Sequence, residues 1–209
     1  MPDWSEENKF TGVIAGIDEA GRGPWAGPVV AGAVVFLTRD INPYLLDSLN
    51  DSKKLSAKKR EQLYELIKEE GLKGNLCYAV GQATAQEIDE INILQATFNA
   101  MRRAVENLSV VPDVALIDGN QTPKPFNCKV KTIIKGDSIS MSVAAASIVA
   151  KVYRDNLLKE LAKEYPQYCF EKNAGYGTKA HIDALKKYGI CKEHRKSYKP
   201  IAAILDETN

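Results

Sequence analysis

Two short apolar runs, VIAGI at 13–17 and VVAGAVVF at 29–36, flank a segment crowded with glycine and proline. Such β-branched runs predict buried strands, and the turn residues between them predict a hairpin-like connection. Three further strands are expected at 75–82 (NLCYAVGQ), 114–119 (VALIDG) and 129–137 (KVKTIIKGD). Consecutive strands followed by strands that alternate with helices favour a mixed sheet in an α/β fold.

Helical patterns separate and follow these strands. The expected helices span residues 57–70, 93–108, 138–165 and 179–188. Ser56 and Thr178 stand at the N-cap positions of the first and last helix, and Gly71 and Gly189 are expected to stop them. Thr84 begins a capping-box pattern ahead of the second helix.

The composition is that of a globular protein: 209 residues, 44% hydrophobic and 26% charged. No run reaches the ~18 to 20 apolar residues of a membrane helix and no signal peptide is visible, so we expect a cytoplasmic protein without membrane contact. The four cysteines form no C-x-x-C pair and there are two histidines, which disfavours a zinc site. We expect one continuous unit, with a core at 12–164 and a helical C-terminal extension at 165–209.

The net charge of +1 hides two basic stretches. Residues 51–60 (DSKKLSAKKR) hold five lysines and arginines against one acid. Residues 172–199 hold eight, interleaved with Tyr176, Tyr188 and Tyr198. Either stretch alone fits a solvated surface, whereas the two together resemble a surface that faces phosphates.

Four acids stand at the ends of apolar strands: Asp18, Glu19, Asp118 and Asp137. Neighbouring residues of a strand point to opposite faces, so Asp18 and Glu19 can serve one site only if the strand breaks there. The glycines and the proline of AGRGP supply such a break. Asp118 also fits an ordinary turn, and Asp137 also fits a helix N-cap.

Strand ends at one edge of an α/β sheet are a common ligand site. Carboxylates gathered there repel one another unless a cation compensates their charge. Because the donors are oxygens, Mg²⁺ or Mn²⁺ are the expected ions. Two such ions would activate a water and stabilise the leaving oxygen in phosphodiester cleavage.

These motifs resemble the ribonuclease HII family, the type 2 ribonucleases H. The matching segments cover most of the chain: GIDEAGRGPWAGPVVAGAVV at 16–35, DSKKLS at 51–56, LIDG at 116–119, KGDSISMSVAAASIVAKVYRD at 135–155, and GYGTKAHIDAL with HRKSYKP within 175–200. The resemblance implies an RNase H-like fold, a five-stranded mixed sheet flanked by helices with a helical C-terminal extension over the substrate groove.

The resemblance also implies the chemistry. The four acids, Asp18, Glu19, Asp118 and Asp137, would hold two Mg²⁺ or Mn²⁺ ions and carry catalysis, with Asp18 and Asp118 as central ligands. The implied reaction is endonucleolytic hydrolysis on the 5′ side of ribonucleotides embedded in duplex DNA, and of RNA in RNA/DNA hybrids. It leaves 3′-hydroxyl and 5′-phosphate ends and would serve ribonucleotide excision repair and RNA primer removal.

Cleavage at a single ribonucleotide requires groups that recognise its 2′-hydroxyl and groups that check the next sugar. The resemblance assigns the first role to Gly21, Arg22 and Gly23. Tyr176 fits the second role by stacking on the following deoxyribose, although a lone tyrosine is more often a packing residue.

Other residues are expected around this site. Lys53 and Lys54 are expected to contact phosphate, as are residues of HRKSYK at 194–199. His181 is expected to be a core or positioning residue rather than a general base. Candidate partners of the metal ligands are Lys151, Arg154 and Asp155. The sequence departs from many relatives at Trp25, where a smaller aliphatic residue is common, and at Ala174, where a basic residue is common.

Three other functions remain open at this point. The chain could be an RNase H-like nuclease or transferase for plain DNA, a non-catalytic nucleic-acid-binding domain, or a phosphoryl-transfer enzyme for a nucleotide or sugar phosphate. All four acids are present, which disfavours the second, and no G-x-x-x-x-G-K-[ST] loop is present, which disfavours the third. The expected partner is nucleic acid. The C-terminal ILDETN has no clamp-binding motif, and we expect a monomer without an obligate protein partner.

Overall fold

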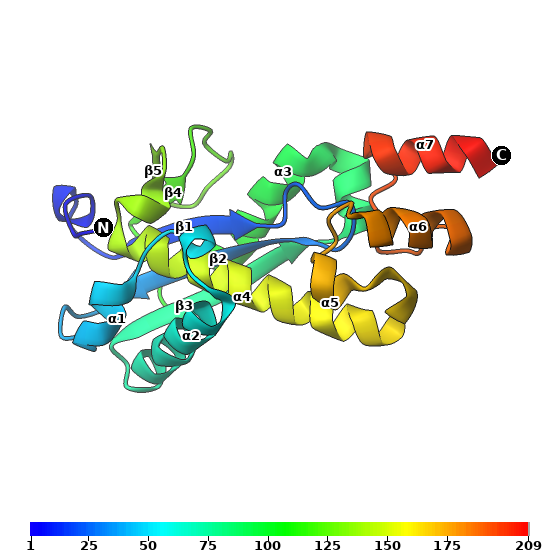
Figure 1. The fold of residues 1–209 in the computed structure, drawn as a ribbon. Helices are drawn as coiled ribbons and strands as arrows, with labels where there is room; N and C mark the ends of the chain where they lie inside the picture. Colours follow the sequence, from blue (N-terminus) through cyan, green and yellow to red (C-terminus); the bar gives the residue numbers. More distant parts are fainter. Residues whose placement is uncertain (209) are drawn as a thin grey trace.

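One mixed sheet forms the centre of the computed structural model (Figure 1). Its strands are β1 (Ile14–Ala20), β2 (Val29–Phe36), β3 (Leu76–Ala83), β4 (Val114–Asp118) and β5 (Lys129–Ile133). They lie in the order β3-β2-β1-β4-β5. β2 pairs antiparallel with β1 and β3, whereas β4 pairs parallel with β1 and β5. The predicted five-stranded mixed sheet is confirmed.

The structure describes residues 1–208, so Asn209, the end of the expected C-terminal extension, lies outside the described residues. The helices are α1 (Pro43–Ser48), α2 (Ala57–Leu72), α3 (Ala85–Glu106), α4 (Met141–Glu164), α5 (Phe170–Asn173), α6 (Lys179–Tyr188) and α7 (Lys199–Thr208). Short 3₁₀ turns are η1 (Glu7–Lys9), η2 (Ser52–Lys54), η3 (Gly136–Ser138) and η4 (Pro166–Tyr168). Across residues 1–208, no helix has the length and apolar character needed to cross a membrane.

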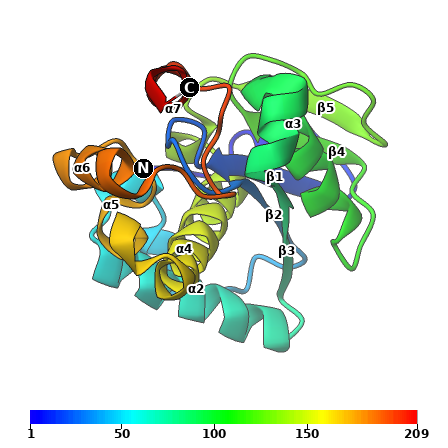
Figure 2. The same ribbon diagram turned by 90° about the vertical axis from the view of Figure 1, so that its right-hand side faces the viewer.

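Helices cover both faces of the sheet: α3 lies on one face, and α4 with α2 on the other (Figure 2). The α4 face is tightly packed because a Cβ at Gly16 of β1 would overlap the backbone of α4 at Ser142. The small residues Ala144, Ala145 and Ala146 are fully buried at this contact. Close packing of α4 against β1 therefore fixes the strand that carries the first two acids.

The C-terminal helices α5, α6 and α7 gather at the end of the molecule opposite η1 (Figure 1). Their core is a separate hydrophobic cluster that includes Leu158 of α4, Tyr168, Phe170, Leu185 and Ile201. Ala26, from the segment between β1 and β2, is buried in the same cluster. The C-terminal region is thus packed directly against the connection that follows the acidic strand.

The predicted N-cap residues Ser56 and Thr84 are in place, whereas several predicted helix limits differ. Ser56 caps α2 as predicted, but Gly71 lies inside that helix, which ends at Leu72. The capping box at Thr84 is present, yet α3 begins directly after it rather than at 93. Asn92 has a left-handed φ of 68° and kinks α3. Its side-chain oxygen accepts hydrogen bonds from the backbone amides of Leu94 and Gln95 and so caps the second half of the helix.

Two further expectations were wrong. The strand expected over 129–137 ends at Ile133, because Lys135 adopts a left-handed conformation and starts the turn η3. The helix expected from 138 begins at Met141, with Ser140 as its N-cap. Thr178 and Gly189 bound α6 as predicted, whereas α7 had no prediction.

Candidate active site

Asp18 and Glu19 lie within β1, not after it. The strand predicted to end at 17 continues to Ala20, where Gly21 breaks it with a φ of +95°. Alternation along the strand places Asp18 on the α4 face and Glu19 on the α3 face. Both nevertheless line one cavity of about 440 Å³ at the end of the strand, since the loop turns away beyond them.

Asp118 is the last residue of β4, the parallel neighbour of β1. Ile17 pairs with Ile117, so Asp18 and Asp118 occupy the next position of the same register. One carboxylate oxygen of Asp118 accepts the amide of Gly136 at 2.7 Å. This bond ties the end of β4 to the turn η3, which carries Asp137.

Asp137 is buried in η3 rather than at the end of a strand. Its pKa is raised by burial and by the negative charge and hydrogen bonding of Asp51, with a further contribution from Asp118. Asp51 is therefore a fifth carboxylate beside the expected four. Sequence reasoning missed Asp51, and its place at the start of the DSKKLS segment is the signal that could have identified it.

Burial and the charges of neighbouring carboxylates raise the pKa values of the first two acids. The pKa of Asp18, which is only 7% exposed, is raised well above its ordinary value by burial and by the charges of Glu19 and Asp118. The pKa of Glu19 is also raised, because burial and the charge of Asp118 outweigh the attraction of Arg22. Anions held this close favour a bound cation.

The donor atoms of this site bear on whether it fits a divalent metal. The donors are carboxylate oxygens, which hard ions such as Mg²⁺ and Mn²⁺ prefer, and their raised pKa values express an unbalanced negative charge. Among residues 1–208, however, no three His, Cys, Asp or Glu side chains form a group ready to hold one ion. The donor chemistry fits a divalent cation, whereas the side chains do not form a finished coordination shell.

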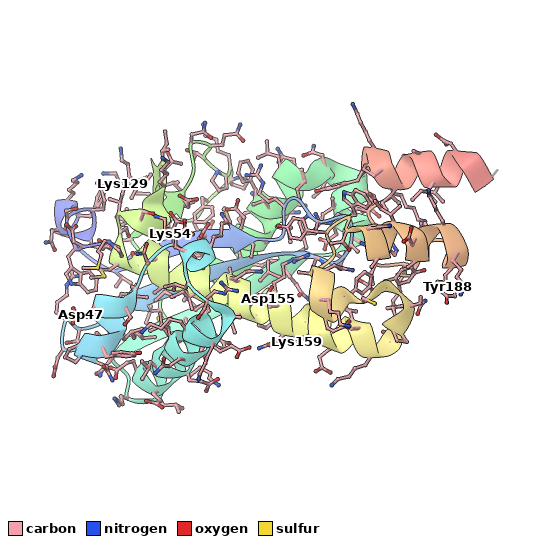
Figure 3. All side chains as sticks on the ribbon, in the orientation of Figure 1. Asp47, Lys54, Lys129, Asp155, Lys159 and Tyr188 are labelled. Carbon is pink, nitrogen blue, oxygen red and sulfur yellow. The ribbon has the colours of Figure 1, made fainter. Side chains whose placement is uncertain are left out.

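Basic residues border the acids. The pKa of Lys53 is raised: burial opposes its charge, but the charges of Asp18, Asp51 and Asp137 outweigh that effect. Lys53 lines the same cavity as Asp18. Lys54, labelled in Figure 3, donates from Nζ to Ser138 Oγ at 3.2 Å, next to Asp137. The structure thus brings both predicted lysines to the acids.

The Gly21–Gly23 loop also lines this cavity. A Cβ at Gly21 would overlap the side chain of Arg154, so the position requires glycine. Arg22 pairs with Glu19, with Nη1 3.3 Å from Oε1. Arg154 is buried and donates to the carbonyl oxygens of Ala26, Pro28 and Ala174. It supports the loop rather than a metal ligand, and Lys151 pairs with Asp155 at 2.6 Å.

Arg195 is one basic residue of the HRKSYK segment that does not face the surface. Its guanidinium is fully buried and donates to the carbonyl oxygens of Gly21, Arg22 and Gly27. Arg195 therefore stabilises the Gly21–Gly23 loop from the interior of the protein. Sequence reasoning missed this role, because Arg195 lies more than 160 positions along the chain from the carbonyl groups that it contacts.

Tyr176 lies opposite the loop. Its side chain is 51% exposed and lines the cavity, and a Cβ at Gly23 would lie 3.6 Å from its ring. The cavity thus brings together the first two acids, the glycine-rich loop, Lys53 and Tyr176. A smaller cavity of about 180 Å³ on the other side of Glu19 is lined by Asp118 and residues of α3.

Comparisons with known proteins agree with this architecture. A family model described as Ribonuclease HII matches residues 15–201. The ribonuclease HII of Wolbachia sp. subsp. Brugia malayi is 54% identical over 200 residues, which cover 96% of this chain and 94% of that protein.

Solved structures share the fold. The ribonuclease H2 from Pyrococcus horikoshii OT3 has a TM-score of 0.74 and 29% identity, covering 93% of this chain and 98% of that one. Bst-RNase HIII, solved in complex with Mn²⁺, has a TM-score of 0.73 at 17% identity, covers 94% of this chain and 70% of that one, and shows a likeness of fold alone. The RNase H-like fold and the nuclease class predicted from the sequence are confirmed, and the chain belongs to the ribonuclease HII family.

Proposed function

We propose that this protein hydrolyses the phosphodiester bond on the 5′ side of ribonucleotides embedded in duplex DNA, and of RNA in RNA/DNA hybrids. The products would carry 5′-phosphate and 3′-hydroxyl ends. The observation that carries the proposal is the shared cavity. Two of the four acids, Asp18 and Glu19, line the same space as a glycine-rich loop suited to a ribose, and Asp118 lines the neighbouring cavity with Glu19.

The acids Asp18, Glu19, Asp118 and Asp137 would hold two Mg²⁺ or Mn²⁺ ions, which activate the attacking water and stabilise the leaving oxygen when bound. Lys53 offsets the negative charge of the acids and would attract a phosphate to them. Within the described chain, the amides of Arg22 and Gly23 have no backbone acceptor and are available to a sugar or phosphate oxygen.

Tyr176 would check the sugar that follows the ribonucleotide. Its exposed ring faces Gly23 across the cavity, where it would stack on a deoxyribose and disfavour a 2′-hydroxyl. Lys53 and Lys54 would contact the phosphates of the same strand. These assignments follow the sequence predictions. They are supported by the position of Tyr176 and Lys53 at the cavity and by the contact of Lys54 with Ser138, next to Asp137.

The cellular role that we propose is ribonucleotide excision repair and RNA primer removal in the cytoplasm. Nucleic acid is the proposed partner, bound by a monomer that needs no obligate protein partner. Residues 12–164 would form the catalytic core, and 165–209 the extension that borders the substrate groove. The packing of Leu185 and Ile201 with Ala26 supports that division of roles within one continuous unit.

A cleavage assay with Mg²⁺ tests the function. The substrates are a DNA duplex with one ribonucleotide, the same duplex without it, and an RNA/DNA hybrid. We expect one nick 5′ of the ribonucleotide, cutting of the hybrid and no cutting of plain DNA. Asp118→Asn should lose the activity while binding is largely kept, because the amide can still accept from Gly136 but carries no charge.

Two results would contradict the proposal. Strong cutting of plain DNA would favour a general nuclease. Binding of all three duplexes without cutting, in Mg²⁺ or Mn²⁺, would favour a non-catalytic binding domain.

A further inference from the structure

The two histidines of the chain, His181 in α6 and His194 in the loop before α7, contact each other. The distance between their Nε2 atoms is 2.9 Å, and both residues are essentially unexposed, at 0% and 1%. They lie among the rings of Trp25, Tyr168 and Phe170. The function proposed above assigns no role to this pair.

The partners at the two ends of the pair determine where the protons are. His181 Nδ1 lies 2.9 Å from the carbonyl oxygen of Tyr176, which can only accept, so Nδ1 carries the proton. His194 Nδ1 accepts the backbone amide of Cys191 at 2.9 Å, with the thiol of Cys191 at 3.3 Å and its carbonyl oxygen at 3.4 Å, and this shortest contact assigns Nδ1 as the bare nitrogen. With both rings neutral, His194 Nε2–H donates to the bare Nε2 of His181. Each of the four ring nitrogens then has a partner.

A proton added to either ring would break this chain. A second proton on His181 would face the Nε2–H of His194, and one on His194 would face the amide of Cys191. Burial lowers the pKa of both histidines, and that of His194 falls to about 4, with the charge of His181 as a further cause. The geometry and the surroundings both favour the doubly neutral pair.

The chain of hydrogen bonds ends on the segment that carries Tyr176. The carbonyl of Tyr176 accepts from His181 and from the amide of Thr178 at 2.8 Å, while its own amide donates to Asn173 at 2.9 Å. Gly177 lies flat against the ring of Trp25, where a Cβ would overlap the indole. The backbone around Tyr176 is thus held on both sides, although its ring is half exposed.

We propose that the neutral His181–His194 pair is a positioning device: it fixes the backbone of Tyr176 and thereby sets how strictly the enzyme requires a deoxyribose after the ribonucleotide. This inference rests on the proposed role of Tyr176 in the proposed function. The pair contacts no substrate and takes no part in the chemical step.

The first test is nitrogen NMR of the two imidazoles at neutral pH; the chain has two histidines, so one single-histidine variant assigns their signals and the tautomers are then read in the wild type. We expect His181 to carry its proton on Nδ1 and His194 to carry its proton on Nε2. Either ring doubly protonated at pH 7, or the opposite tautomers, would overturn the proposal.

The second test measures where the enzyme cuts a duplex that holds a short run of ribonucleotides. If Tyr176 demands a following deoxyribose, cuts concentrate 5′ of the last ribonucleotide of the run. His194→Leu removes both ring nitrogens at similar volume, and with them the bonds to His181 and to the Cys191 amide. We expect the preference for that position over internal positions to fall roughly fivefold, the effect of losing the bond that supports His181. The turnover number on a single ribonucleotide should change less than the preference.

His194→Gln is the conservative variant, since its amide can still donate to His181 Nε2, and it should restore most of the preference. Circular dichroism establishes that each variant is folded. Tyr176→Ala separates the two proposals. If it leaves the preference unchanged, the role of Tyr176 fails. If it abolishes the preference while His194→Leu, folded, keeps it, the role of the histidine pair fails and that of Tyr176 stands.

Discussion

Arg195 donates from Nη2 to the carbonyl oxygen of Gly21 at 2.6 Å, which links the segment before the last helix to the loop after the acidic strand. The same side chain donates to Arg22 at 2.9 Å and to Gly27 at 3.0 Å. Burial lowers the pKa of this guanidinium, and the nearby Tyr198 and the charge of Asp89 partly offset that effect. Carbonyl dipoles and the hydroxyl of Tyr198, 2.9 Å from Nη1, stabilise its charge.

Arg195→Gln should therefore disturb the conformation of the Gly21–Gly23 loop while the protein still folds. We expect a loss of about 2–4 kcal/mol in the free energy of unfolding, because several buried carbonyls lose their donor. We also expect at least a roughly tenfold loss in cleavage at a single ribonucleotide, as the loop is no longer held against the acids. Urea unfolding and the cleavage assay measure the two effects.

Arg195→Lys distinguishes geometry from charge. Lysine keeps the charge but cannot reach three carbonyls with a planar fork, so we expect it to restore little. Lys163→Gln, which removes a charge from an exposed side chain of α4, is the matched control and should change neither quantity. Full activity of Arg195→Lys would show that charge alone matters.

Local signals in the sequence predicted the parts of this structure that depend on local chemistry. Thr84 and Thr178 cap their helices as expected, and Gly189 ends α6. The left-handed turn at Lys135 and the kink at Asn92 escaped prediction. Lysine rarely adopts a positive φ, and asparagine, which does so more readily, also occurs within helices with ordinary dihedral angles.

Within the candidate site, too, some residues could be predicted from the sequence and others could not. The four acids, the glycine-rich loop and Tyr176 could be selected from motifs in the sequence. The roles of Arg195 and His194 could not, because each depends on partners brought together by the fold. Residue type predicted a surface arginine, whereas the structure buries it.

Gly177 and Trp25 form a contact that a double-mutant cycle can test. Gly177→Ala should destabilise the protein by roughly 1–3 kcal/mol and reduce the preference for a following deoxyribose, because the new methyl group overlaps the indole. Trp25→Leu should restore space, so the double variant is expected to be more stable than the sum of the single changes predicts. Strict additivity in urea unfolding would contradict the contact.

The lowered pKa of His194 predicts how stability changes with pH. The unfolded histidine binds a proton near its ordinary pKa of 6.5, whereas the folded one does so only at about 4. Stability from this group is therefore complete above pH 6.5, falls as the pH drops towards 4, and changes no further below that. The full effect is roughly 3 kcal/mol.

Buried acids with raised pKa values act in the opposite direction, since they favour the folded state when protonated. The measurement is therefore the difference between wild type and His194→Gln in urea unfolding from pH 4 to 8. We expect the advantage of the wild type to shrink as the pH falls from 6.5 to 4. A difference that stays constant over this range would contradict a neutral buried His194.

Asp118→Asn tests whether the acids repel one another in the absence of a divalent cation. The charge of Asp118 raises the pKa of Asp18, Glu19 and Asp137, so its removal should leave the metal-free protein as stable as wild type or more stable by up to about 1 kcal/mol. Added Mg²⁺ should raise the melting temperature of the wild type and have a smaller effect on the variant, since ligand binding to the folded state stabilises it. Asp47→Asn, on exposed α1, is the control and should keep the Mg²⁺ response. Calorimetry with EDTA and with Mg²⁺ makes the comparison, and a metal-free variant clearly less stable than wild type would mean that Asp118 supports the fold rather than a cation site.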